Sequence, residues 1–315
     1  MADSSVQIAV VVPVYNEEQN LQALLDRLFP VMQGLGKSFE IIFIDDGSRD
    51  NSLHILRGFT KYEQIKVVEL TRNYGQHAAI MAGFSICRGD IVITMDADLQ
   101  NPPEEIPRLI QVMENGNYDI VGTIRKGRRD SFLRILPSKL INIVARKITG
   151  VTMRDWGCML RAYRRPVVER MIQCHEHSTF IPALATVFGK RSTEIEVSHE
   201  ERFAGKSSYP LRKLINLQFD LVASFSDLPI KLIMYGGILM SLFGVCFGAV
   251  LAIARLVYGA SWAAEGVFTL FAILFVFVGM QFFALGVIGE YIGRIYLEVR
   301  KRPEYVIEHI YFRES

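Results

Sequence analysis

The sequence predicts an α/β fold in which a mostly parallel sheet is covered by helices on both faces, followed by two membrane-spanning helices. Three observations predict it. Continuous apolar segments alternate with helical patterns over residues 8–122, as in parallel sheets that are buried on both faces. Polar residues cluster where these apolar segments end. Two long uncharged segments follow in the C-terminal half of the chain.

Five short apolar runs are the expected strands, at residues 8–12, 40–44, 66–70, 91–95 and 119–122. Helices are expected between them, at 17–32, from 50 onward, at 75–86 and from 102 onward. In the first helix, Leu21, Leu24, Leu25 and Leu28 share one face. Pro102 and Pro103 suit the first turn of the fourth. In such sheets, ligands bind at the carboxyl ends of the strands.

Asp96, Asp98 and Gln100 follow the fourth expected strand. Alternating residues of an extended segment point the same way, so we expect these three side chains to converge on one ion. Carboxylate and amide oxygens suit Mg²⁺ or Mn²⁺ with a diphosphate attached. The alternative is a solvated turn. Other polar groups at strand ends are Asn16–Glu17, Asp45–Ser48 and Arg125.

The chain has 315 residues and a mean hydropathy of +0.22. Residues 232–254 and 266–289 carry no charge, and each run exceeds the roughly 20 residues that cross a bilayer. Buried core helices are the alternative. Cations lie outside the pair, at Arg212, Lys213 and Lys231 and again from Arg294 to Arg302, while residues 257–265 hold neither Lys nor Arg. The distribution predicts cytoplasmic termini and a cytoplasmic N-terminal region, and no cleavable signal peptide is expected.

Residues 125–147 contain eight Lys or Arg and a single acidic residue, Asp130, a pattern typical of segments that meet phosphates or anionic lipid. Residues 131–148 have helical apolar spacing, which predicts a helix in the membrane interface. A surface helix packed on the sheet is the alternative. A second interfacial helix is expected at 210–227. Residues 305–312 look like a terminal strand that needs a sheet edge on this chain or on a neighbouring subunit.

Several common motifs are missing. No Gly-x-Gly-x-x-Gly follows a strand, which disfavours a dinucleotide site. Gly205-Lys206-Ser207 resembles the end of a P-loop, but position 200 is Glu where that motif requires glycine. The four cysteines form no Cys-x-x-Cys pair, so neither zinc nor a disulfide framework is indicated. No nucleic-acid partner is expected.

Three motifs carry a resemblance to a known family. Residues 12–17 (VPVYNE), 45–48 (DDGS) and 96–104 (DADLQNPPE) resemble the family 2 glycosyltransferases that load sugars onto polyprenyl phosphate. Residues 72–77, 157–165, 178–182, 263–268 and 289–294 are similar to the Gram-negative group that transfers 4-deoxy-4-formamido-L-arabinose. The resemblance covers nearly the whole chain. It implies a Rossmann-like, glycosyltransferase A-type catalytic domain.

The resemblance also implies roles for individual residues. Pro13, Tyr15 and Glu17 would line the nucleotide-base pocket, Asp45 or Asp46 would contact uridine, and Asp96 would lie near the ribose and the metal. Asp98 and Gln100 would hold Mg²⁺ or Mn²⁺. Arg125, Arg134 and Arg202 match positions near the phosphates, and Asp155 matches an active-site carboxylate. Arg128 and Lys139 are further candidates for the acceptor phosphate. Ser208 stands where the family usually has lysine, which puts a lysine–phosphate contact in that loop in doubt.

The implied reaction is metal-dependent, inverting transfer of the sugar from UDP to undecaprenyl phosphate at the bacterial inner membrane, a step in lipid A modification and polymyxin resistance. Transfer of glucose or mannose is the alternative; a processive synthase or transporter and a silent scaffold are the rivals.

We also expect a homo-oligomer, a tetramer. The expected divisions are a nucleotide-sugar core at 1–130, interface helices at 131–148 and 210–227, the rest of the catalytic domain at 149–209, spans at 229–258 and 264–293, and a tail at 294–315.

Overall fold

The computed structural model describes residues 6–125, 158–174, 180–198, 200, 228–258, 267–300 and 302–313. The chain divides into two compact units. The first contains Met1–Leu214 together with Pro303–Ser315, and the second contains Ile215–Arg302. The first unit holds the sheet, and the second holds two long helices.

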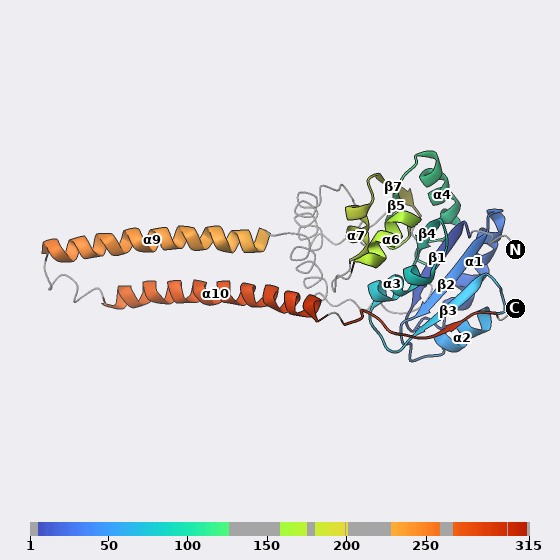
Figure 1. The fold of residues 1–315 in the computed structure, drawn as a ribbon, viewed down its shortest axis with the longest axis horizontal. Coiled ribbons are helices and arrows are strands. Elements are labelled where there is room, and N and C mark those ends of the chain that lie inside the picture. Colours follow the sequence, from blue (N-terminus) through green and yellow to red (C-terminus); the bar gives the residue numbers. More distant parts are fainter. Residues whose placement is uncertain are drawn as a thin grey trace. The chain divides into compact units, whose positions relative to one another are not determined.

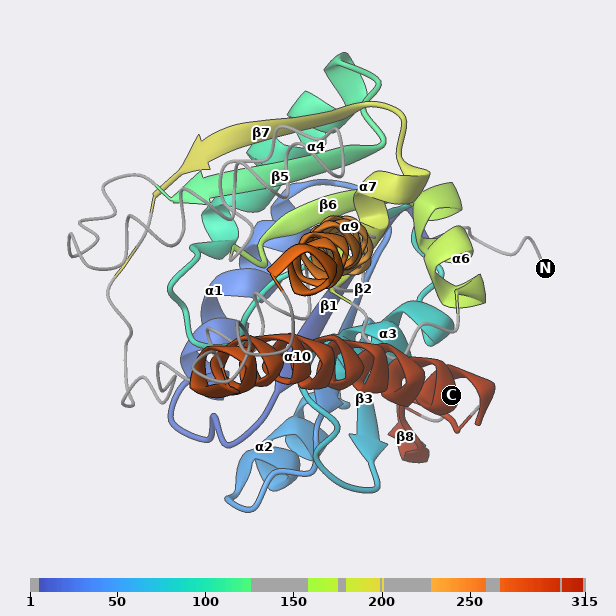
Figure 2. The same ribbon diagram turned by 90° about the vertical axis from the view of Figure 1, so that its left-hand side faces the viewer.

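The first unit is built on an eight-stranded sheet with the order β7-β5-β6-β4-β1-β2-β3-β8. The strands are β1 (Ile8–Val14), β2 (Phe39–Asp45), β3 (Ile65–Leu70), β4 (Ile91–Thr94), β5 (Ile120–Arg125), β6 (Arg161–Arg164), β7 (Ser192–Val197) and β8 (Ile307–Tyr311). Strands β4, β1, β2 and β3 are parallel, as are β5 and β7. Strands β6 and β8 run antiparallel to their neighbours. The mostly parallel sheet is therefore confirmed, and β7 and β8 form its two edges (Figure 2).

Helices cover both faces of the sheet (Figure 1). One face packs against α1 (Leu21–Gly34), α2 (Ser52–Phe59) and α4 (Ile106–Asn115), which follows a 3₁₀ turn at Pro103–Glu105. The other packs against α3 (Gln76–Ile86), α6 (Arg165–Gln173) and α7 (Ile181–Phe188). Successive strand residues alternate between the two cores: Val10 and Val12 lie in the first, and Ala9 and Val11 in the second. Burial on both faces explains why the strands are continuously apolar.

The first helix begins at Leu21, four residues later than the sequence predicts. The backbone N–H groups of Asn16, Glu17 and Glu18 donate instead to side chains between β2 and the first residue of α2, at Ser48 (3.0 Å), Ser52 (2.9 Å) and Asp50 (3.2 Å) respectively. These bonds tie the loop after β1 to the loop after β2. They hold the carboxyl ends of two neighbouring strands in one piece.

The terminal strand is confirmed, and it pairs with its own chain. β8 lies antiparallel to β3, with Val68 opposite Ile310. The hydroxyl group of Tyr311 donates to Glu69 Oε2 (2.6 Å), and Arg57 also contacts Glu69 (3.1 Å). Because β8 pairs with β3 of its own chain, it gives no support to the expected homo-oligomer, which stays a prediction.

The second unit contains α9 (Leu228–Tyr258) and α10 (Val267–Val299). Both are long and apolar enough to cross a membrane, by length and composition, over Ile233–Val250 and Val276–Gly293. Many of their large apolar side chains are exposed, among them Leu239 and Phe282. Gly244 of α9 packs against α10, because a Cβ added there would come 3.3 Å from the Phe277 ring. The two expected interface helices and the loop between the spans lie outside the described residues.

Gly47 is held in a conformation and a space that only glycine fits. Its φ is +67°, and an added Cβ would lie 2.6 Å from the carbonyl carbon of Arg72 and 2.7 Å from the backbone nitrogen of Asn73. We expect Gly47→Ala to lower the free energy of unfolding by at least about 2 kcal/mol, because left-handed strain and a backbone clash add together. Urea unfolding would measure this. Gly36 is the matched control: its φ is +62° and its Cβ would meet nothing within 4 Å. Equal losses for Gly36→Ala and Gly47→Ala would contradict the clash.

Candidate active site

The polar clusters that follow β1, β2 and β4 lie at one edge of the sheet, because these strands are parallel. β1 ends at Val14, directly before Tyr15. Pro13 is partly buried, and Tyr15 is exposed. Glu17 Oε2 accepts a hydrogen bond from Asn20 Nδ2 (2.5 Å). Because Tyr15 is exposed, its ring is available to a ligand at this edge of the sheet.

Asp46 anchors the start of α3. Its two carboxylate oxygens accept the backbone N–H groups of Tyr74 (2.7 Å) and Gly75 (2.8 Å). Asp46 is buried, and this desolvation raises the pKa of its carboxyl group while the two hydrogen bonds oppose the rise. Both oxygens are therefore engaged in holding the loop that precedes α3.

Asp45 is different, because only one of its oxygens is engaged. Oδ2 accepts the backbone N–H of Ser48 (3.2 Å). Oδ1 is buried and has no hydrogen-bond partner among the described residues. Burial raises the pKa of Asp45, and Ser48 opposes the rise. A buried oxygen without a partner is costly, so Asp45 is the better candidate for a ligand contact.

The residues after β4 form a turn, so the expected extended arrangement is wrong. β4 ends at Thr94 and residues 97–100 turn, with Leu99 in the left-handed region at φ +61°. Asp98 Oδ1 accepts the backbone N–H of Gln100 (3.2 Å), which closes the turn locally. Alternation along a strand therefore does not bring Asp96, Asp98 and Gln100 together. The turn instead brings the backbone of Gln100 against the Asp98 carboxylate.

Asp96 is contacted from α3. Gln76, the first residue of that helix, donates its Nε2 to Asp96 Oδ1 (2.5 Å). Asp98 is almost completely buried, at 6% exposure. Asp46, α3 and the turn after β4 thus form one connected group: Asp46 fixes the start of α3, and α3 positions Asp96.

The oxygen atoms at this turn fit a hard divalent ion that takes its remaining ligands from a substrate. Among the described residues, no group of three or more His, Cys, Asp or Glu side chains could hold a metal ion. Two carboxylates and one amide are what this turn provides. Mg²⁺ is typically held by one or two carboxylates, with water and substrate phosphates completing its shell. The residues therefore suit an ion that arrives with a diphosphate.

A network of buried hydrogen bonds lies next to the turn after β4. Asn101 Oδ1 accepts from Cys158 Sγ (3.3 Å), and Thr123 Oγ1 lies 2.9 Å from the same sulfur. Thr123 also donates to the carbonyl of Leu160 (2.8 Å). The network joins the turn to β5 and to the segment before β6.

Comparison with known proteins identifies the family. A family model described as glycosyl transferase family 2 matches residues 9–172. The matched residues include the carboxyl ends of β1, β2 and β4, where the polar clusters lie. The chain belongs to glycosyl transferase family 2. It is 53% identical over 310 residues to the undecaprenyl-phosphate 4-deoxy-4-formamido-L-arabinose transferase of Shewanella sediminis, covering 98% of this chain and 93% of that protein. It is 52% identical over 306 residues to the protein of the same name from Proteus mirabilis, covering 96% and 94%.

Solved structures agree with this family 2 fold. A glucosyl-3-phosphoglycerate synthase from Mycobacterium tuberculosis, in complex with Mn²⁺, UDP and glucosyl-3-phosphoglycerate, superposes with a TM-score of 0.52 at 18% identity, covering 71% of this chain and 81% of that one. The expected glycosyltransferase A-type architecture is confirmed. The chain is a family 2 glycosyltransferase.

Some expected site residues of this family 2 glycosyltransferase cannot be placed. Arg125 is the last residue of β5, at the carboxyl edge of the sheet, and its side chain is not among those that the structure describes. The others lie outside the described residues altogether: Arg128, Arg134, Lys139, Asp155 and Arg202. Their expected roles stay predictions.

Sequence patterns missed Gln76, Asn101, Thr123 and Cys158. Gln76, Asn101 and Cys158 lie in stretches that carry the family resemblance, but the resemblance gives them no individual role. No spacing rule identifies Asn101, Thr123 and Cys158, because their contacts join the turn after β4 to β5 and to the segment before β6. Only knowledge of the pairing between these strands would reveal them.

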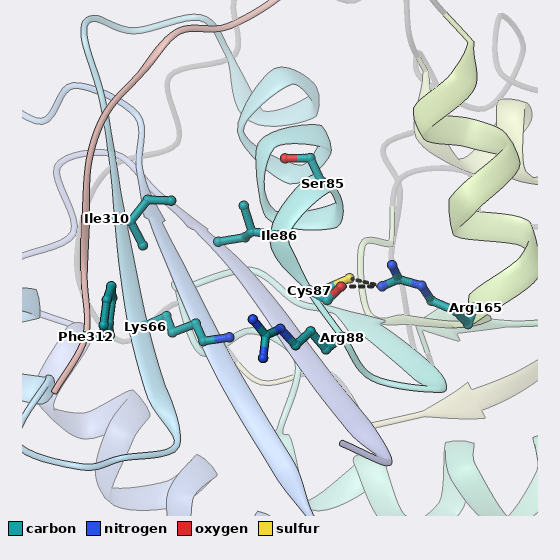
Figure 3. Close-up of a pocket in the computed structure, with 8 residues that line it drawn as sticks. All are labelled: Lys66, Ser85, Ile86, Cys87, Arg88, Arg165, Ile310 and Phe312. Carbon is teal, nitrogen blue, oxygen red and sulfur yellow. Dashed lines mark hydrogen bonds between the residues drawn. The ribbon is translucent and has the colours of Figure 1, made fainter. Parts of the chain in front are cut away.

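A pocket of about 660 Å³ lies at the opposite, amino-terminal edge of the sheet (Figure 3). Three cations line it, and two already have partners: Lys66 pairs with Glu40 (2.7 Å) and Arg165 with Glu169 (3.0 Å). Arg165 also contacts the carbonyl and the sulfur of Cys87. Burial raises the pKa of the Cys87 thiol to about 12, so it is not a nucleophile at neutral pH.

Proposed function

We propose that this chain transfers 4-deoxy-4-formamido-L-arabinose from UDP to undecaprenyl phosphate. One observation carries the proposal: the named relatives match at 52–53% identity over nearly the full length, both apolar helices included. The geometry supports it, because nucleotide, diphosphate and metal each find suitable groups at the carboxyl edge of the sheet.

The uridine base is assigned to the first two strand ends. Asp45 Oδ1, which is buried and has no described partner, accepts a hydrogen bond from the base. Tyr15 is exposed beside it and offers a ring for stacking. Pro13 and Glu17 complete the pocket. Asp46 is assigned a structural role, since each of its oxygens accepts a hydrogen bond from a backbone N–H group.

Asp96, Asp98 and Gln100 would hold Mg²⁺ or Mn²⁺ next to the diphosphate. When bound, such an ion offsets the charge of the departing UDP. Gln76 keeps Asp96 oriented toward the site through its 2.5 Å hydrogen bond. The turn fixed by Asp98 and Leu99 sets the direction of these ligands.

The acceptor phosphate carries a charge of about −1.5 to −2 at neutral pH. Arg125, Arg128, Arg134 and Lys139 are assigned to it, with Arg202 near the phosphates and Asp155 as an orienting carboxylate. A phosphate oxygen is already a competent nucleophile, so the proposal includes no strong general base. Attack opposite the leaving UDP inverts the anomeric carbon.

We place α9 and α10 in the bacterial inner membrane, with the catalytic unit and both termini in the cytoplasm. The cations outside the two uncharged runs support this orientation. The segments at 131–148 and 210–227 then lie in the interface, where the lipid phosphate resides.

Arg134→Ala should raise the KM for undecaprenyl phosphate about tenfold or more, since charge-assisted bonds to phosphate are among the stronger ones. The KM for the UDP-sugar should change little. Initial rates measured at varied acceptor and varied donor concentration separate the two constants. Equal increases in both would argue against an acceptor-phosphate role.

A donor screen tests the proposal as a whole. Purified full-length protein is incubated with undecaprenyl phosphate and one UDP-sugar at a time, and the lipid products are identified by mass spectrometry. We expect the formamido-arabinose donor to give the largest kcat/KM. A larger value for UDP-glucose or for a mannose donor would support the alternative within the family.

A further inference from the structure

His77 lies in the first turn of α3, at the catalytic edge of the sheet. Its neighbour Gln76 donates to Asp96, and the preceding residue Gly75 is held by Asp46. The backbone position of His77 is therefore fixed from two sides. The residue is not part of the nucleotide or metal assignments made above.

The side chain of His77 contains a buried polar atom without a partner. Nδ1 is shielded from solvent and makes no hydrogen bond to any described residue. The ring meets Phe180 edge to face, with centroids 5.2 Å apart and planes at 69°. Phe180 directly precedes α7, so the starts of α3 and α7 approach each other here.

The imidazole is neutral at physiological pH. Burial lowers the pKa of His77 to about 4, and the positive end of the helix dipole also disfavours a cation in this first turn. A neutral imidazole offers one N–H donor and one nitrogen acceptor. It suits a neutral polar partner, such as a hydroxyl or an amide, better than a phosphate.

A buried polar atom without a partner needs an explanation, because most such atoms in native proteins are satisfied. An ordered water is the simple one. The place of this atom favours a ligand: it stands one residue from the group that contacts Asp96, and an aromatic ring lies beside it. Rings of this kind pack against the apolar faces of sugars while polar neighbours bind the hydroxyls.

We propose that His77 hydrogen-bonds a neutral polar group of the transferred sugar, with Phe180 packed beside it, and that His77 thereby helps to set the donor preference. The inference rests on the proposed function, since it takes the donor to be a UDP-sugar bound at Asp96. It assigns the nucleotide to Asp45 and the sugar to the start of α3.

The experiment compares His77→Leu and His77→Asn in the full-length protein. Three quantities are measured: kcat/KM for the formamido-arabinose donor, the Kd of UDP with Mn²⁺ by calorimetry, and the Tm. His309→Leu is the matched control, since His309 is exposed on β8. Asparagine keeps a polar group near the position of Nδ1, and leucine does not.

For His77→Leu we expect kcat/KM for the donor to fall about fivefold to tenfold, the size expected of one neutral hydrogen bond. The Kd of UDP should stay unchanged, because UDP lacks the sugar. The Tm should be unchanged or higher, since the substitution removes an unsatisfied buried atom. His77→Asn should recover most of the lost kcat/KM, and His309→Leu should behave as the wild type.

Two results would overturn the inference: an unchanged donor kcat/KM in His77→Leu, or an equal weakening of UDP and donor. A lower Tm that His77→Asn restores without restoring donor use would show a structural role instead. Failure of the proposed function looks different. The wild type would then reject the formamido-arabinose donor, and the same comparison with the sugar it accepts would still test His77.

Discussion

Asp98→Asn should abolish metal-dependent sugar transfer and leave the fold intact. Asparagine can still accept the backbone N–H of Gln100, so the turn that Asp98 closes is retained. An amide oxygen is a much weaker ligand for a hard divalent ion than a carboxylate. Because charge stabilisation by a metal is worth several kcal/mol, we expect kcat/KM to fall about a thousandfold.

Initial rates of transfer at fixed Mn²⁺, together with calorimetry of UDP binding in the presence of Mn²⁺, would measure this effect. Asp90→Asn is the matched control, since Asp90 is exposed just before the other end of β4. It should keep full activity. Turnover of Asp98→Asn at the wild-type rate would remove the metal assignment, whereas loss of folding would show that the turn needs the carboxylate itself.

Asp45 and Asp46 are adjacent, yet their substitution by asparagine should have different consequences. In Asp45→Asn we expect the affinity for UDP to fall about tenfold, because a neutral amide oxygen accepts a weaker hydrogen bond from the base than a charged carboxylate does. The free energy of unfolding should be unchanged or higher, since a buried charge with one unpaired oxygen is removed.

Asp46→Asn should instead destabilise the protein, by about 1–3 kcal/mol. An amide NH₂ group replaces one of the oxygens that accept the N–H groups of Tyr74 and Gly75, so one of these backbone groups loses its partner. Urea unfolding and UDP calorimetry on both variants separate the two roles. The assignment is wrong if Asp46→Asn is as stable as the wild type and Asp45→Asn is the destabilised one.

The sequence predicts the central strands well because burial on both faces makes them continuously apolar. Strands β1 to β4 lie within two residues of their expected positions. β6 was not expected: it begins with Arg161, which is completely buried, and a segment containing two arginines gives no strand pattern. Its antiparallel insertion between β4 and β5 depends on packing across the sheet.

The site shows the same division. The carboxylates at strand ends are visible in the sequence, because parallel strands bring their ends to one edge. The shape of the turn after β4 is not, since Leu99 adopts a left-handed conformation that the sequence would assign to glycine or asparagine. The roles of Asp45 and Asp46 likewise depend on Tyr74 and Gly75, which are distant in sequence.

Whether the transfer needs a divalent ion can be measured directly, by following labelled sugar from its UDP donor onto undecaprenyl phosphate in the presence and absence of a chelator. We predict that EDTA stops formation of the 4-deoxy-4-formamido-L-arabinosyl lipid and that added Mn²⁺ or Mg²⁺ restores it. Undiminished transfer after complete chelation would contradict a role for the metal.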